Sequence, residues 1–200
     1  MIRRSEKKGI YVIGTSVLAE IIWYICQNIP LEIKGFFDDF SKVKSFQGVK
    51  IFGGMDYLSR NKSRFSDANF FIAIGDNLNR KKVYQRLKKD NFALANIIDP
   101  GAKIEKSAKI GEGNLIFNNA YLGVKTVLGD CNLIFPGVIL NHHNKVGSFN
   151  HLSPNVSIGG LTTIGSAAHI GMNSVIAPFV TIEDNFSCPP LTEVDKNYDQ

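Results

Sequence analysis

The sequence predicts two unlike domains in one chain: a small parallel α/β sheet, and after it a solenoid of short parallel strands. Three observations carry this prediction. Residues 7–98 alternate apolar runs with segments of helical spacing, residues from 104 onward place an aliphatic side chain at every sixth position, and the charge divides between the same two parts. Through Asp99 there are 17 basic and 10 acidic residues, leaving 6 and 8 of the totals of 23 and 18, so the parts carry +7 and −2.

The first part begins with a strand at residues 9–14 that ends in a Gly-Thr-Ser turn, followed by a helix at 17–28. We expect further strands at 33–37, 49–52 and 69–74, and further helices near 55–58 and 79–89. This alternation is typical of a doubly wound sheet, where ligands bind at the carboxyl ends of the strands. The residues expected at those ends are Gly14, Thr15, Ser16, Val17, Asp38, Asp39, Gly75, Asp76 and Asn77.

Each of these strand ends also has a simpler interpretation. The turn after Gly14 opens a helix whose free N–H groups suit an anion, or it is a plain connection. Asp38 and Asp39 would accept hydrogen bonds from a base or a ribose, or belong to a solvated turn. The basic segment at residues 80–89 is expected to be a solvated helix face, with steering of anionic ligands as the alternative.

The second part is built on a strict six-residue repeat. Fourteen consecutive positions six apart, from Ile104 to Ile182, are all Ile, Leu or Val, and Gly follows seven of them. The repeat predicts a three-faced coil of eighteen residues, so that residues eighteen apart lie one above another at roughly 4.8 Å. We expect the glycines to allow the backbone geometry at the bends.

Fourteen hexads make about four and two-thirds coils, and the sequence after them indicates a stop. The next inward position is Cys188, and Pro189 and Pro190 follow it directly. We therefore expect three segments: an α/β domain at 1–99, a solenoid at 100–188 and a polar tail at 189–200.

Composition excludes several classes of protein. The net charge of +5 would suit nucleic acid, but the basic residues lie in the first part and no nucleic-acid module accompanies them. No segment reaches the roughly 20 apolar residues of a membrane helix, and the N-terminus has no secretory cleavage site. Three separated cysteines favour neither a disulfide framework nor a zinc cluster, and fit a reducing cytoplasm.

The [Ile/Leu/Val]-Gly-x-x-x-x repeat resembles that of the hexapeptide acyltransferases. The preceding domain makes the chain similar to the sialic-acid O-acetyltransferase and UDP-N-acetylbacillosamine N-acetyltransferase group, through residues 37–40, 70–77, 80–85 and 141–160. The resemblance covers about residues 7–186. It implies a small Rossmann-like domain that binds a sugar nucleotide, a left-handed parallel β-helix, a homotrimer with sites between subunits, acetyl-CoA as co-substrate, and no metal.

The resemblance also implies a catalytic site. His142 matches the family's general base, with an exposed surface histidine as the alternative, and Gly160 lies one coil further on, where its N–H would face an oxyanion. His143 replaces the family's Glu or Asp; a neutral histidine orients its neighbour but does not stabilise an imidazolium as a carboxylate does. His151, Gly171 and Met172 match acetyl-CoA contacts.

Two features depart from the family pattern. The turn at Gly14 lacks the family's later glycines and histidine, and the tail lacks its Gly-x-Pro-Ala-Lys segment. His169, one coil after His151, is expected to be a stacked surface residue.

The leading hypothesis is N-acetylation of a UDP- or dTDP-linked deoxyamino sugar in surface glycan biosynthesis, with His142 as base. Alternatives are O-acetylation of a sialic-acid-type sugar, a metal hydratase of the γ-carbonic-anhydrase type, and a non-catalytic scaffold. The hydratase needs a His-x-x-x-x-His pair, and no two of the four histidines are five apart.

Overall fold

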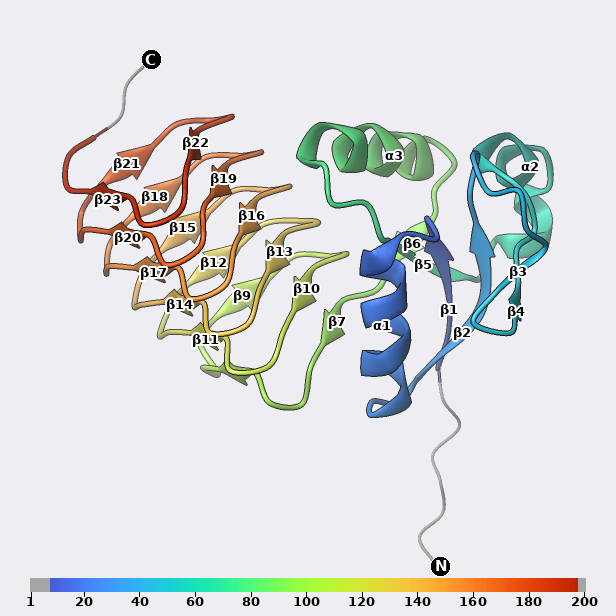
Figure 1. Cartoon of the computed structure of the whole chain (residues 1–200), viewed down its shortest axis with the longest axis horizontal. Helices are drawn as coiled ribbons and strands as arrows, with labels where there is room; N and C mark the ends of the chain where they lie inside the picture. Colours follow the sequence, from blue (N-terminus) through green and yellow to red (C-terminus); the bar gives the residue numbers. More distant parts are fainter. Residues whose placement is uncertain (1–7, 198–200) are drawn as a thin grey trace, which may run out of the picture. The chain divides into compact units, whose positions relative to one another are not determined.

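The structure is a computed structural model of the 200-residue chain and describes residues 8–197. The chain divides into two compact units, Met1–Ile97 and Ile98–Gln200 (Figure 1). The first is an α/β unit and the second a parallel β-helix, so the predicted fold class is confirmed.

The first unit is built on a parallel sheet of four strands in the order β2-β1-β5-β6. Apolar runs of the sequence form its centre, and Ile10, Val12, Phe70 and Phe71 are fully buried. The strands are β1 (Lys8–Ile13), β2 (Leu31–Phe37), β5 (Asn69–Ile72) and β6 (Ala93–Leu94). The helices are α1 (Val17–Gln27), α2 (Met55–Arg60), the 3₁₀ helix η1 (Lys62–Phe65) and α3 (Asn77–Lys89).

The prediction of a third parallel strand at residues 49–52 is confirmed only in part. β3 (Ser45–Phe46) and β4 (Val49–Lys50) form an antiparallel hairpin instead. The residues after β4 run parallel to β2, through a bridge between Ile51 and Phe36 and a hydrogen bond of 2.9 Å from the Phe52 amide to the Phe36 carbonyl. The two residues between the strands, Gln47 and Gly48, have φ of 49° and 74°. Positive φ at both central residues defines the tight turn that favours hairpins.

The second unit stacks seventeen two-residue strands into three parallel sheets. The predicted six-residue positions are the second residues of these strands; their side chains fill the axis of the helix, buried from Ile116 through Val194. The strands are β7 (Ile97–Ile98), β8 (Lys103–Ile104), β9 (Lys109–Ile110), β10 (Leu115–Ile116), β11 (Tyr121–Leu122), β12 (Val127–Leu128), β13 (Leu133–Ile134), β14 (Ile139–Leu140), β15 (Lys145–Val146), β16 (His151–Leu152), β17 (Ser157–Ile158), β18 (Thr163–Ile164), β19 (His169–Ile170), β20 (Val175–Ile176), β21 (Thr181–Ile182), β22 (Ser187–Cys188) and β23 (Glu193–Val194).

The helix extends beyond the bounds expected from the sequence, because Pro189 and Pro190 do not end it. β23 pairs with β20, and Val194 is only 1% exposed. The two prolines lie in the turn between β22 and β23, and the amide that bonds back to the preceding coil belongs to the next residue, Leu191, which donates to the Met172 carbonyl. Proline lacks an N–H and is tolerated at a turn position that donates none. Residues 187–194 therefore belong to the β-helix rather than to a tail.

The glycines of the repeat have a different role from the one expected. Positive φ recurs every six residues from Gly113 to Leu191, two positions after the repeat glycines, and most of the residues there are not glycine. The repeat glycines are required by close stacking. A Cβ on Gly129 would lie 2.8 Å from the carbonyl carbon of Gly147, and one on Gly147 would lie 2.8 Å from that of Gly165.

Buried asparagines stack beside this column. Asn114, Asn132 and Asn150 lie one above another, and the side-chain oxygen of Asn114 accepts the Asn132 amide at 2.8 Å, as that of Asn132 accepts the Asn150 amide. Within residues 8–197 no buried side-chain nitrogen or oxygen lacks a partner. The corners of the coil are thus polar without leaving polar groups unsatisfied.

We predict that Gly147→Ala lowers the free energy of unfolding by about 1–3 kcal/mol, because the new methyl group meets backbone that has little room to move. Denaturant-induced unfolding measures the change. Gly75→Ala is the matched control, since a Cβ there meets nothing within 4 Å. Equal unfolding free energies for the two variants would contradict the close-stacking explanation.

Candidate active site

The carboxyl ends of β1, β2 and β5 enclose a cavity of about 480 Å³ in the first unit. Six of the nine residues predicted for this site line it: Gly14, Thr15, Ser16, Asp38, Asp39 and Gly75. Gly14 has φ of 101°, and a Cβ there would lie 3.0 Å from the Ala73 carbonyl oxygen. Glycine is therefore required at this turn by conformation and by space.

Asp38 lines the cavity, and its carboxylate accepts four hydrogen bonds from neighbouring loops. One carboxylate oxygen accepts the Thr15 amide at 2.9 Å and the Thr15 hydroxyl at 2.6 Å. The other accepts the amides of Phe40 and Ser41 at 2.8 and 3.0 Å. All four bonds are internal, so Asp38 holds the two loops together, and a ligand would have to compete for its oxygens.

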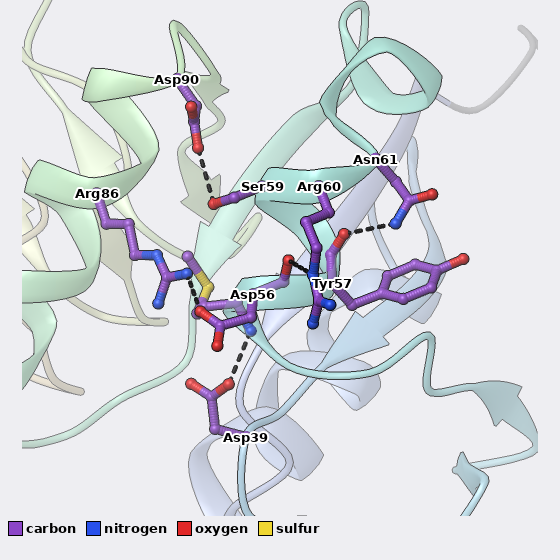
Figure 2. Close-up of polar contacts among 9 residues, drawn as sticks. Asp39, Asp56, Tyr57, Ser59, Arg60, Asn61, Arg86 and Asp90 are labelled. Carbon is purple, nitrogen blue, oxygen red and sulfur yellow. Dashed lines mark hydrogen bonds and ion pairs between the residues drawn. The ribbon is translucent and has the colours of Figure 1, made fainter.

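Asp39 and Arg86 fix the start of α2 at another wall of the cavity (Figure 2). An Asp39 oxygen accepts the Met55 amide at 2.8 Å, and Met55 lines the cavity. The next residue, Asp56, forms an ion pair with Arg86 of α3. The hydrogen bond and charge of Arg86 lower the pKa of the Asp56 carboxyl. The cavity wall is thus tied to α3 through an exposed ion pair.

Three predicted residues do not line the cavity. Val17 is 73% exposed outside it. Asp76 is the N-cap of α3 and accepts the Asn79 amide, and the Asn77 side chain accepts a hydrogen bond from Arg80. Asp76 and Asn77 thus stabilise the N-terminus of α3, the helix whose later residues line the cavity.

The expectation that residues 80–89 form a solvated face is wrong for Arg80, which is 0% exposed. Its guanidinium donates to the carbonyls of Ile74 and Gly75 at 2.9 and 2.8 Å. Lys82 of the same helix lines the cavity. Helical spacing explains the division, because Asn79, Lys82 and Val83 share one face of α3 that meets the cavity.

Sequence reasoning also missed Phe40, whose ring is 92% exposed at the cavity although it is aromatic. The sequence could have indicated this residue, because a large aromatic side chain directly follows Asp38 and Asp39 at a predicted strand end.

In the second unit His142 and His143 lie at the corner between β14 and β15, and Gly160 lies beside them at the same corner of the next coil, between β17 and β18. A Cβ on Gly160 would lie 2.5 Å from Cε1 and 2.6 Å from Nε2 of His142, so the imidazole occupies the space that a side chain would fill. Nδ1 of His142 lies 3.2 Å from Nδ1 of His143. Both histidines are exposed.

His151 lies in β16, whereas His142 lies at the corner between β14 and β15. Its ring stacks on Phe135 at 4.6 Å and on His169 at 4.5 Å between centroids, so the stacking expected for His169 is present. Gly171 and Met172 begin the turn after β19; Gly171 is buried against the Pro189–Pro190 backbone, and Met172 is 48% exposed. The structure of one chain therefore does not bring these three residues to His142.

A search of the described residues for metal ligands finds no group of three His, Cys, Asp or Glu side chains placed to hold an ion. In the same part of the chain, no helix is long and apolar enough to cross a membrane.

Comparisons with known proteins agree with both units. Residues 9–87 match the family model described as the PglD N-terminal domain. A stretch of 77 residues is 35% identical to the UDP-N-acetylbacillosamine N-acetyltransferase of Bacillus subtilis, covering 38% of this chain and 36% of the relative. The chain spans 21–36% of the length of the curated relatives it matches.

Solved structures extend the similarity over nearly the whole fold. The acetyltransferase domain of PglB from Neisseria gonorrhoeae superposes with a TM-score of 0.86 at 20% identity, covering 96% of this chain and 94% of that one. A mutant of perosamine N-acetyltransferase from Caulobacter crescentus, in complex with CoA and GDP-perosamine, gives 0.83 at 23% identity, covering 92% and 90%. The resemblance to the hexapeptide-repeat sugar acyltransferases is thereby confirmed.

We predict that Arg80→Met lowers the free energy of unfolding by about 1–3 kcal/mol, because the carbonyls of Ile74 and Gly75 and the side chain of Asn77 lose the donor supplied by a buried guanidinium. Lys89→Met, an exposed change on the same helix, serves as control and is expected to stay within about 0.5 kcal/mol of the wild type. Chemical denaturation of both variants measures the effect, and an Arg80→Met protein as stable as the control would contradict it.

Proposed function

We propose that this protein transfers an acetyl group from acetyl-CoA to the amino group of a nucleotide-linked deoxyamino sugar. The observation that carries the proposal is the exposed His142 imidazole lying over Gly160, on a β-helix that follows a unit matching the PglD N-terminal domain. An imidazole beside a position without a side chain places a base next to the Gly160 backbone, whose N–H can donate to a substrate carbonyl.

The chemistry requires one base and one oxyanion site. The sugar amine gives up a proton to His142 as its nitrogen attacks the thioester carbonyl carbon, and the carbonyl oxygen becomes negative. The Gly160 N–H would donate to this oxygen; among residues 8–197 it has no other acceptor. The C–S bond then breaks, and the CoA sulfur leaves with the proton that His142 held. His143 acts on His142 and not on the substrate.

Acetyl-CoA suits the acyl donor role because a thioester needs neither a metal nor a covalent enzyme intermediate. His151, Gly171 and Met172 are the proposed contacts for it. His151 lies in β16, and Gly171 and Met172 lie in the turn between β19 and β20, whereas His142 lies in the turn between β14 and β15. We propose that neighbouring copies of the chain bring the two sets together, in a homotrimer with sites between subunits.

The cavity of the first unit is the proposed site for the nucleotide. Phe40 offers an exposed ring on which a base can stack, and Lys82 supplies a cation for the diphosphate. Relatives named for UDP-N-acetylbacillosamine and GDP-perosamine favour N- over O-acetylation. We therefore include UDP-, dTDP- and GDP-linked amino sugars among the candidate acceptors.

We predict that thiol release from acetyl-CoA depends on an amino sugar nucleotide and that His142→Ala lowers kcat by roughly 100-fold or more, the usual contribution of a general base. Asn185→Ala, at an equivalent left-handed corner far along the repeat, is the control and should keep wild-type rates. Sialic acid in the same panel tests O-acetylation. An unaffected His142→Ala enzyme, or no turnover with any acceptor, would refute the proposal.

We predict that Lys82→Ala raises KM for the sugar nucleotide about tenfold, with kcat and the KM for acetyl-CoA little changed, because a single phosphate contact is lost. Lys88→Ala, on the same helix outside the cavity lining, is the comparison. Steady-state kinetics with each substrate varied separately measures the effect. Equal changes in both variants would mean that Lys82 acts only through the overall charge.

A further inference from the structure

The contact between His142 and His143 joins two nitrogens of the same kind. Their Nδ1 atoms lie 3.2 Å apart, with the rings at 83° to each other. A neutral imidazole has one N–H and one bare nitrogen, so a single proton lies between the two atoms and one ring accepts it. The contact therefore couples the tautomer of His142 to the state of His143.

The two possible arrangements have opposite consequences at Nε2 of His142. If His143 donates, Nδ1 of His142 accepts, and the proton of neutral His142 must be on Nε2. If His142 donates from Nδ1, its Nε2 is bare. Because the Nε2 edge of the ring lies against Gly160, only the second arrangement presents a base to the proposed substrate site.

We propose that His143 is a positioning residue that accepts the Nδ1–H of His142 and so keeps Nε2 of His142 unprotonated and ready to take a proton. This inference rests on the proposed function. A carboxylate beside a catalytic histidine both orients the ring and stabilises its cation. In this proposal the neutral imidazole of His143 does only the first.

The backbone holds His143 in place for this role. Its φ is 59°, and its amide donates to the Val124 carbonyl of the preceding coil at 2.7 Å. The amide of His142 is fixed separately by the side-chain oxygen of Asn141 at 3.0 Å. Both rings therefore start from restrained backbone positions, and their contact does not depend on a mobile loop.

The charged groups around the pair are cations. Lys125 occupies the corner position one coil before His143, and Lys145 follows in β15. No residue among 124–127, 142–145 and 160–163 is acidic. Within one chain, His143 is thus the group placed to accept the Nδ1 proton of His142.

An added proton removes the base wherever it binds. On His142 it occupies Nε2, and on His143 it reverses the hydrogen bond and moves the His142 proton to Nε2. The arrangement therefore requires both imidazoles to be neutral. A carboxylate at position 143 would instead stabilise the His142 imidazolium.

Three substitutions at this position separate the possible roles. His143→Asn puts an acceptor oxygen where Nδ1 lies and tolerates left-handed φ; we expect kcat within about threefold of the wild type. His143→Ala removes the acceptor, and kcat should fall roughly tenfold or more with unchanged KM. His143→Asp should retain activity, because a carboxylate also accepts the Nδ1–H of His142. Asn185→Ala controls for loss of a corner side chain, and Ala167 shows that alanine fits such a corner.

The tautomer is measured without turnover by long-range proton–nitrogen NMR of protein labelled with ¹⁵N-histidine. We expect neutral His142 to carry its proton on Nδ1 and to be bare at Nε2. In His143→Ala we expect part of the molecules to carry the His142 proton on Nε2 instead. A wild-type His142 protonated at Nε2, or His143→Asn kinetics equal to those of His143→Ala, would overturn the inference. If no acceptor sugar is turned over, the proposed function fails, and the NMR result still decides the role of His143.

Discussion

The ladder of hydrogen bonds between successive coils of the β-helix is the constraint on which the rest of the second unit depends. Strand amides donate to carbonyls seventeen residues on, as Leu133 does to Asn150 at 2.8 Å, and every strand pairs in the same register with the one eighteen residues later. A coil length that never changes places like positions above one another. Residues eighteen apart therefore form columns along the axis, and the members of one column contact one another whether they are aliphatic, polar or glycine.

Three such columns show how strictly the ladder acts. Aliphatic side chains stack in the centre, asparagines stack at a buried corner with their oxygens on the next amide, and Gly111, Gly129, Gly147 and Gly165 stack where coils approach too closely for a Cβ. The left-handed corner residues, costing roughly 1–2 kcal/mol each when they are not glycine, are held by their own amides, as Leu161 is by the His142 carbonyl. The same register brings Gly160 beneath the imidazole of His142.

Sequence periodicity predicted the aliphatic column and the eighteen-residue coil, because a ladder with fixed spacing turns a pattern along the chain into contacts in space. It predicted neither the close stacking that requires the glycines nor the hydrogen bonds of the asparagine column. The juxtaposition of His142 and Gly160 followed from their separation of eighteen residues, and so did the stacking of His151 and His169. The end of the helix was missed because proline was judged by its usual effect on strands, although Pro136 and Pro154 mark the same turn position as Pro190 in earlier coils. The first unit has no such repeat from which contacts could be read. The hairpin follows from the positive φ of Gln47 and Gly48, and the burial of Arg80 follows from the position of the Ile74 carbonyl that its guanidinium binds.

The absence of a side chain at position 160 makes room for the His142 ring, and in the proposed function the substrate carbonyl reacts beside that ring. Gly160→Ala tests it most directly, since the new Cβ would meet atoms at the end of a flexible side chain rather than backbone. Kinetics of acetyl transfer and a crystal structure of the variant are the measurement. We expect an intact β-helix, a displaced His142 ring and a kcat lower by roughly 100-fold. A Gly160→Ala enzyme with wild-type kcat, or with its His142 ring unmoved, would contradict it.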